Sequence, residues 1–350
     1  MNVPSKSKIK AILLGVFFAA GLAEAMVRFF PTWHDTFLQD IVHSQLPTDL
    51  YKPVGGFKPG ERPDKPRFKH HPNRQAQFKG LEFDNWVYTD ENGFRVASSG
   101  RVNRPVDKRI LLLGDSFLFA GQVSWSQSFV GQLEAGVHNV DWLNAGVDGY
   151  NTSDALMLWK ESKVKVDEVW LFFFWGNDIW ENDWSSRPPM KPDETAEVSL
   201  EGKDTLLTTL QYSRFISRLY ALWAIQTDDR FAEKQAQIDQ LRDVDQLRTA
   251  LEASEKQLDA LALECVRQKV ECRIWLVPPM EAFTESGLAE QVVTEIQTIV
   301  PPIISATDLT PVLQPEGPGL YFQSDPHWNP KGHQVVADWL IKQEQYTKSK

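Results

Sequence analysis

A serine, a histidine and a carboxylate stand at the ends of short apolar stretches of this 350-residue chain. The stretch "ILLLGDSFLFAG", residues 110–121, interrupts an apolar run with Gly-Asp-Ser, and Ser116 closes that triplet. Near the C-terminus, "SDPHWNPKGH" places Asp325 two residues before His327. A serine hydroxyl becomes a good nucleophile when a histidine takes its proton, and a carboxylate keeps that histidine in the required tautomer. These residue types predict acyl transfer, with Ser116 as nucleophile, His327 as base and Asp325 as the orienting acid.

Acyl transfer also needs hydrogen-bond donors aimed at the oxyanion of the tetrahedral intermediate. "NAG" ends at Gly146 after a second apolar stretch, and "GNDI" places Asn177 after a third. We therefore predict three oxyanion donors, which are the backbone N–H groups of Ser116 and Gly146 and the side-chain amide of Asn177. Glycine at position 146 would let the backbone approach the substrate closely.

Each of these residues also has an ordinary structural interpretation. Ser116 could cap a following helix, and Asp325 could be an acid in the first turn of the last helix. His333 competes with His327 as the base, but it stands inside a helical pattern where a packed histidine is the simpler interpretation. Asn177 could be a loop residue. The triad interpretation is preferred because all of its parts occur together.

Two further aspartates, Asp115 and Asp178, are interpreted as turn formers that bond nearby backbone amides. Together with Asp325 and His327 they could in principle hold a divalent ion. The chain has no tight ligand motif such as HExxH, and no Lys-Ser/Thr pair follows the glycines of residues 114–121 as a phosphate-binding loop requires. The sequence therefore predicts neither a metal nor a cofactor.

Thirteen tryptophans are many for a chain of this length. Trp175 lies in an apolar run and is predicted to pack in the core. Trp180, Trp184 and Trp328 flank the predicted site and are predicted to contact substrate, as an apolar wall or as a platform for sugar rings.

The elements that must position these side chains alternate from residue 109 onward. Short apolar strands are predicted in "RILLLG", "NVDWLNAG", "EVWLFFFW", "CRIWLVP" and "PIISATDL", with helical patterns between and after them. Such alternation predicts a parallel sheet with helices on both sides, and continuous apolar strands fit burial on both faces. Sites in such sheets form beyond the carboxyl ends of the strands, where the predicted catalytic residues stand.

Four segments in this order resemble the blocks of the SGNH (GDSL-type) hydrolase family. "GDSF" resembles the block with the serine nucleophile, "NAG" and "GNDI" resemble the two blocks with oxyanion donors, and "DPHWN" resembles the block with acid and base. The resemblance covers residues 108–345. It implies an α/β fold of three α/β/α layers, with a flavodoxin-like parallel sheet of about five strands.

The chain departs from the family pattern at two places. Trp175 stands where the third block often has glycine, and the last block has the short form Asp-x-His. The short form resembles the exported bacterial branch related to alginate O-acetylation, and "ENGFR" resembles membrane-anchored bacterial members. The resemblance thus implies acetyl transfer as a rival to hydrolysis.

The N-terminal residues 1–28 read as an export signal. Three lysines precede an apolar run over residues 11–23, and Ala-Glu-Ala at 23–25 is a candidate cleavage site. We predict an uncleaved anchor in the inner membrane, with the catalytic domain in the periplasm or outside the cell. Secretion after cleavage is the alternative.

The remaining boundaries follow from composition. Residues 29–107 are predicted to form an extended linker and a small β element, and residues 108–345 the catalytic domain. A mostly helical insertion is predicted at 185–268, and its long helix could bind a protein partner. Cys265 and Cys272 could pair outside the cytoplasm or remain two buried thiols. The net charge of −10 argues against nucleic acid as a partner.

From these features the sequence predicts an exported serine esterase that removes acyl groups from a carbohydrate or lipid ester. Two alternatives stay open. One is an O-acetyltransferase of envelope or extracellular polysaccharide that uses the same triad. The other is a non-catalytic, membrane-anchored scaffold.

Overall fold

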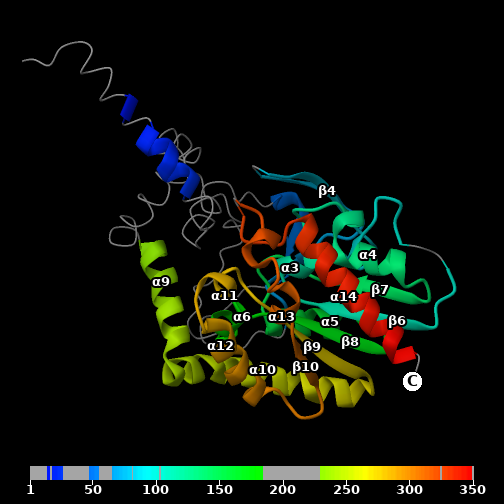
Figure 1. Cartoon of the computed structure of the whole chain (residues 1–350). Coiled ribbons are helices and arrows are strands. Elements are labelled where there is room, and N and C mark those ends of the chain that lie inside the picture. Colours follow the sequence, from blue (N-terminus) through cyan, green and yellow to red (C-terminus); the bar gives the residue numbers. More distant parts are fainter. Residues whose placement is uncertain are drawn as a thin grey trace, which may run out of the picture.

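The centre of the computed structural model is a mixed eight-stranded sheet with the strand order β10-β9-β8-β6-β7-β5-β4-β3 (Figure 1). The structure describes residues 14–15, 18–26, 47–54, 65–80, 82–101, 104–183, 229–323 and 325–348. The strands of this sheet are β3 (Gln75–Lys79), β4 (Asp84–Thr89), β5 (Arg95–Val96), β6 (Lys108–Leu113), β7 (Val140–Asn144), β8 (Glu168–Phe174), β9 (Glu271–Val277) and β10 (Ser305–Asp308). The predicted α/β class is confirmed.

Five neighbouring strands of the sheet are parallel, in the order β7-β6-β8-β9-β10. Numbered along the chain this is 2-1-3-4-5, which is the flavodoxin-like order. The chain passes from β6 to β7 on one side and then returns from β7 to β8 on the other side of β6, so the switch point lies between β6 and β8. Ligand sites of such sheets form at the carboxyl ends of the strands at this point.

Helices cover both faces of the parallel strands. The helices are α3 (Ser116–Phe119), α4 (Phe129–Gly136), α5 (Thr152–Ser162), α6 (Asp178–Glu181), α9 (Asp229–Arg242), α10 (Val244–Gln268), α11 (Glu281–Thr284), α12 (Leu288–Ile299), α13 (Thr310–Leu313) and α14 (Pro330–Lys348). Helices α4 and α14 share one hydrophobic core with the sheet, and α5, α10 and α12 share another. The three layers follow from these two cores.

The alternation of side chains along β6 shows how the two cores are separated. Ile110 and Leu112 lie in the core beneath α4 and α14, whereas Leu111 and Leu113 lie in the core beneath α5 and α10. All four are fully buried. A strand whose successive side chains point to opposite faces needs apolar residues at every position when both faces are covered, which is why "ILLL" has no polar break.

The region predicted as a small β element is part of the central sheet. Strands β3, β4 and β5 pair antiparallel with one another, and β5 joins the edge of β7 through the pair Arg95–Asn144. The sheet is therefore mixed and larger than the predicted parallel sheet of about five strands. Ahead of it, β1 (Tyr51–Pro53) and β2 (Phe68–His70) form a separate antiparallel pair.

Two predicted segments are only partly described. Within residues 1–28 the described residues are helical, and no helix among the residues that the structure describes is long and apolar enough to cross a membrane. Residues 184–228 of the predicted insertion lie outside the described residues. The rest of the insertion forms α9 and α10, which are separated at Asp243, the residue that caps α10. Leu247, Leu251, Leu258 and Leu261 of α10 are buried in the core, so this helix covers the sheet, whereas Leu263 on its outer side is exposed.

Cys265 at the end of α10 and Cys272 in β9 form a disulfide. Both are buried in the core shared by α5, α10 and α12. The bridge closes a short loop that includes the left-handed residue Lys269 at the end of the helix. It therefore fixes the return of the chain from the helix to the sheet.

We predict that removing this bridge lowers the free energy of unfolding by about 2.5 kcal/mol, the loop-closure value for a loop of this length. Urea unfolding of wild type and of the Cys265→Ala/Cys272→Ala variant, each with and without reductant, measures this. Reductant is expected to destabilise only the wild type. Equal unfolding midpoints in all four samples would contradict the prediction.

Candidate active site

Ser116 is the first residue of α3, directly after β6. Asp115 caps this helix, because its carboxylate accepts the N–H of Phe117 at 3.0 Å. The buried apolar residues of α3 anchor the turn that connects β6 to this helix. The serine is thus both nucleophile candidate and helix start, and the capping role belongs to Asp115.

The segment with Asp325 and His327 is a loop tied back on itself ahead of α14. Tyr321 and Trp328 form an antiparallel bridge, and the N–H of Phe322 donates to the carbonyl of His327 at 3.0 Å. Asn329 then starts α14, where its side-chain oxygen accepts the N–H groups of Lys331 and Gly332. Proline at the first helical position suits this start. The motif is therefore held on both sides.

The structure brings the three predicted catalytic side chains together. The Nε2 of His327 lies 2.6 Å from the Oγ of Ser116, and its Nδ1 lies 2.6 Å from Oδ1 of Asp325. The same carboxylate oxygen accepts the backbone N–H of His327 at 2.9 Å. Both distances are within the range that a nucleophile–base–acid relay requires.

The predicted oxyanion donors differ in whether their N–H groups are already hydrogen-bonded within the protein. Asn177 follows β8, and its Nδ2 donates to the carboxylate of Asp115 at 3.3 Å. That contact leaves the second N–H of the amide for another acceptor. The N–H of Ser116 lies in the first turn of α3, where helical N–H groups lack intrahelical partners.

Gly146 lies where predicted, after β7, but its N–H is engaged. It donates to Oδ1 of Asn144 at 3.0 Å, and Nδ2 of Asn144 donates to the carbonyl of Leu118. A Cβ at position 146 would lie 2.5 Å from the N of Phe119. Glycine is therefore required here for the close approach of β7 to α3, and its role as an oxyanion donor stays a prediction.

Two buried aspartates support the site. Asp115 is almost fully buried, and burial raises its pKa to about 7. Asp178 accepts the N–H of Thr152 at 2.8 Å, and burial together with the nearby Asp115 raises the pKa of Asp178 well above its usual value. Both carboxyls bond backbone amides, as the turn-former interpretation predicts.

The structure contradicts one of the tryptophan predictions and agrees with another. Trp328 is completely buried, and its ring packs edge-on against Phe117 and Phe129. The prediction that it contacts substrate is therefore wrong, because the bridge to Tyr321 turns it into the core beneath α14. Trp175 is buried as predicted. Trp184 lies outside the described residues.

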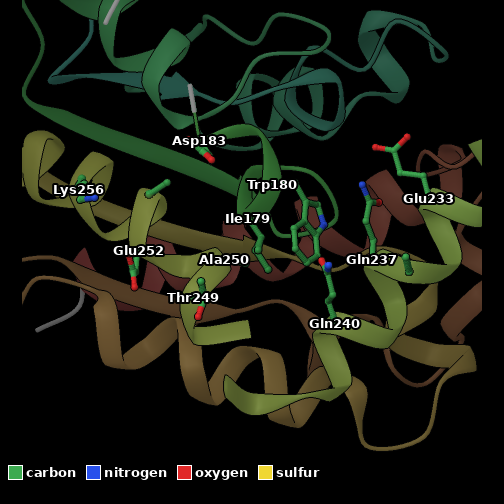
Figure 2. A pocket seen from close by; sticks show the side chains of 12 residues that line it. Ile179, Trp180, Asp183, Glu233, Gln237, Gln240, Thr249, Ala250, Glu252 and Lys256 are labelled. Carbon is green, nitrogen blue, oxygen red and sulfur yellow. The ribbon is translucent and has the colours of Figure 1, made fainter. Parts of the chain in front are cut away.

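Trp180 borders a cavity of about 560 Å³ between α6, α9 and α10. Its backbone N–H donates to the carbonyl of Asn177 at 2.9 Å, so Trp180 lies in the helical turn that begins at the oxyanion candidate. Figure 2 shows its ring beside Gln237 and Gln240. The lining is mixed, with amides, a hydroxyl and charged groups beside one indole, an isoleucine and three alanines.

His333 does not compete as a base. It is buried against the ring of Phe129, and burial lowers its pKa to about 3. Its Nδ1 accepts the N–H of Phe129. It is a neutral core histidine, as its helical context indicated. Among the described residues, no group of three or more His, Cys, Asp or Glu side chains is placed to hold a metal ion.

Four residues around the triad were not predicted. Gln122 contacts the imidazole of His327, Asn144 occupies the N–H of Gly146, and Arg95 and Asn85 bind the loop after α3. Asn144 stands in the "NAG" segment and could have been suspected as an Asx-turn former. Nothing in the sequence near the other three signals a link to residue 327.

No family model and no curated protein matches the chain. Among solved structures, it is similar to the acetylxylan esterase Axe2 of Geobacillus stearothermophilus, with 14% identity over 68% of this chain and 94% of that chain and a TM-score of 0.38. It is also similar to a member of the lipolytic protein G-D-S-L family from Veillonella parvula, with 15% identity over 68% and 98% of the two chains and a TM-score of 0.36. An α/β hydrolase from the metagenome of Lake Arreo has a TM-score of 0.39 at 13% identity, over 68% and 95% of the two chains. These TM-scores lie below 0.5, so the function proposed below rests on the site itself.

The buried carboxyl of Asp115 predicts a pH-dependent stability. Its raised pKa means that the folded protein holds this proton more tightly than the unfolded chain, so the free energy of unfolding should fall as pH rises from about 4 to about 7. Asp115→Asn removes this titration. The stability of the variant relative to wild type should therefore increase across that window, by about 4 kcal/mol at most, and stay constant below it.

Urea unfolding of both proteins at a series of pH values measures this difference. Asp84→Asn, at an exposed carboxylate on β4, is the control. A difference between the Asp115 variant and wild type that does not change with pH would show that residue 115 does not titrate in the window.

Proposed function

We propose that this protein is a serine esterase that works through a covalent acyl-enzyme. The observation that carries the proposal is the continuous hydrogen-bond chain Ser116–His327–Asp325, with both links at 2.6 Å. Ser116 comes from the turn after β6, and Asp325 and His327 come from one loop 211 residues further on, yet the three side chains converge at the carboxyl ends of the strands. A helix cap or a turn former alone has no need for this convergence.

In the proposed reaction, His327 takes the hydroxyl proton of Ser116 as Oγ attacks the ester carbonyl carbon. The imidazolium is stabilised by Asp325, and the oxyanion by Asn177 and the N–H of Ser116. The imidazolium then gives its proton to the leaving alcohol as the carbon–oxygen bond breaks. Water attacks the acyl-enzyme by the same route, which releases the carboxylic acid and restores the serine.

The cavity beside Trp180 supports a carbohydrate ester as substrate. Its size is within the range of ligand sites of roughly 300–1,000 Å³. An indole offers an apolar face for a sugar ring, and the amides of Gln237 and Gln240 and the hydroxyl of Thr249 offer partners for sugar hydroxyls. A long acyl chain would favour a more apolar lining, so we place the sugar here.

We further propose that the enzyme acts outside the cytoplasm, with an N-terminal anchor. The basic and apolar residues of the segment 1–28 support export. The disulfide between Cys265 and Cys272 supports it independently, because structural disulfides persist in oxidising compartments. Fractionation of cells and N-terminal sequencing of the mature protein test the anchor; a mature chain that starts at Met26 would exclude it.

The nucleophile assignment predicts that a fluorophosphonate probe labels the wild type at Ser116. Ser116→Ala and His327→Ala should abolish labelling, because one lacks the hydroxyl and the other the base. Asp325→Asn should slow ester hydrolysis by about three to four orders of magnitude. Ser126→Ala, at an exposed serine, serves as control and should be labelled normally. An unlabelled wild type, or equal labelling of Ser116→Ala, would exclude the proposal.

The sugar assignment predicts a substrate-dependent effect of Trp180→Ala. For an O-acetylated oligosaccharide we expect KM to rise about tenfold, which corresponds to the loss of one aromatic contact of about 1.4 kcal/mol. Hydrolysis of p-nitrophenyl acetate, which has no sugar, should stay within about twofold of wild type.

Trp86→Ala, at an exposed tryptophan on β4, is the matched control and should change neither substrate. Equal losses on both substrates would assign Trp180 a structural role only. Analysis of the products with an added oligosaccharide acceptor completes the test, since acylated sugar in excess of free acid would contradict hydrolysis as the main reaction.

A further inference from the structure

Gln122 contacts the same ring nitrogen of the catalytic histidine as Asp325. The side-chain Nε2 of Gln122 lies 3.0 Å from Nδ1 of His327, and Oδ1 of Asp325 lies 2.6 Å from that nitrogen. Gln122 is buried, and its Oε1 has no hydrogen-bond partner among the described residues. Which end of this amide faces Nδ1 depends on whether that nitrogen carries a proton.

Whether Nδ1 of His327 carries a proton determines which atom of the Gln122 amide can form a hydrogen bond with it. When Nε2 of His327 accepts the proton of Ser116, its Nδ1 carries a hydrogen that is donated to Asp325. A nitrogen that donates in this way cannot also accept from an N–H of Gln122. A half-turn of the glutamine amide exchanges Oε1 and Nε2 at almost unchanged shape, and then Oε1 faces the Nδ1–H.

We propose that Gln122 is a positioning residue for His327, whose Nδ1–H it accepts through Oε1 together with the carboxylate of Asp325. This inference rests on the serine esterase function proposed above. The forked bond holds the ring in its plane from a second side. It also places a carbonyl dipole against the imidazolium that forms in each transition state, where hydrogen bonds to a charged group are strongest.

The backbone that carries Gln122 is fixed by the antiparallel strands. The guanidinium of Arg95 in β5 is buried and donates to the carbonyls of Phe119, Ala120 and Val123. The side-chain amide of Asn85 in β4 donates to the carbonyl of Gln122 itself. The loop thus has fixed anchors on both sides of residue 122, which a side chain needs in order to orient another.

The charged and titratable groups around the ring come from several elements. Asp325 lies on its own loop, Asp115 on the turn before α3, and Asp148 on the loop after β7. His333 on α14 is buried and neutral. Gln122 adds a neutral acceptor to this set, so a carboxylate in its place would add one negative charge next to Nδ1.

The test uses Gln122→Leu and Gln122→Glu, assayed with p-nitrophenyl acetate from pH 5 to 9. Gln122→Leu removes the acceptor at similar volume, and we expect kcat to fall by about 10- to 100-fold with KM within about twofold. Gln122→Glu stabilises the imidazolium, so the acid limb of kcat/KM should move to higher pH by about one unit or more. If Gln122 only filled space, Gln122→Leu would keep the kcat and the pH profile of the wild type, since it has a similar volume.

Matched variants separate the local effect from folding. Gln75→Leu and Gln75→Glu make the same changes at an exposed position of β3 and should leave kcat and the pH profile unchanged. Thermal melting of each variant reports loss of fold. Asn85→Ala should lower kcat by about three- to tenfold without moving the pH profile, since it loosens the loop but keeps the acceptor.

The outcomes distinguish this inference from the function on which it rests. A wild type that hydrolyses ester and is labelled at Ser116, while folded Gln122 variants keep its kcat and pH profile, would overturn the positioning role alone. Wild-type kcat in Asn85→Ala would overturn the contribution of the β4 strand. A wild type without esterase activity or labelling would overturn the esterase function itself.

Discussion

One hydrogen bond sets the demands on the rest of the structure, the 2.6 Å contact between Nε2 of His327 and Oγ of Ser116. It joins residues 211 positions apart, and neither residue lies within a strand. A catalytic contact tolerates only a small misplacement, so both turns have to be rigid. On the serine side, the cap formed by Asp115 and the buried α3 hold the turn. On the histidine side, the bridge of Tyr321 to Trp328 does the same.

The second demand on the structure is that the catalytic loops exclude water, and three buried aspartates in these loops show how far they do so. Burial raises the pKa of Asp115, Asp148 and Asp178, which come from the loops after three neighbouring strands. The low dielectric that disfavours these charges also strengthens each hydrogen bond within the triad. Asp148 accepts the hydroxyl of Tyr51 at 2.6 Å, so the β1–β2 pair is bound to the loop after β7.

The sequence predicted the parts of this site that follow from local rules. Apolar runs marked the parallel strands, and Ser116, Gly146 and Asn177 directly after three of them had to meet at one edge of the sheet. Asp325 and His327 follow the last strand at a greater distance and were assigned to the same edge from their residue types. What it could not predict depends on contacts between distant segments. "NAG" reads as an oxyanion donor, yet the bond from Gly146 to Asn144 arises only in the folded turn. Trp328 lies next to His327 in the chain, but the bridge to Tyr321 sends the two side chains to different sides. Nothing local links Gln122 to residue 327.

The antiparallel strands explain why the region before the parallel sheet belongs to the site. Added to the edge of β7, strands β5, β4 and β3 move the exposed edge of the sheet three strands away from the catalytic loops. Edge protection alone would not require a buried arginine. Arg95 forms the single pair between β5 and β7, and its guanidinium donates to three carbonyls at the end of α3 and in the loop after it. In this loop the left-handed residue Ala120 turns the chain away from the helix. A buried guanidinium without these acceptors would be strongly destabilising. The guanidinium on the strand and the carbonyls of the loop satisfy one another's hydrogen-bonding groups. The edge of the sheet and the surroundings of His327 therefore form one cooperative unit.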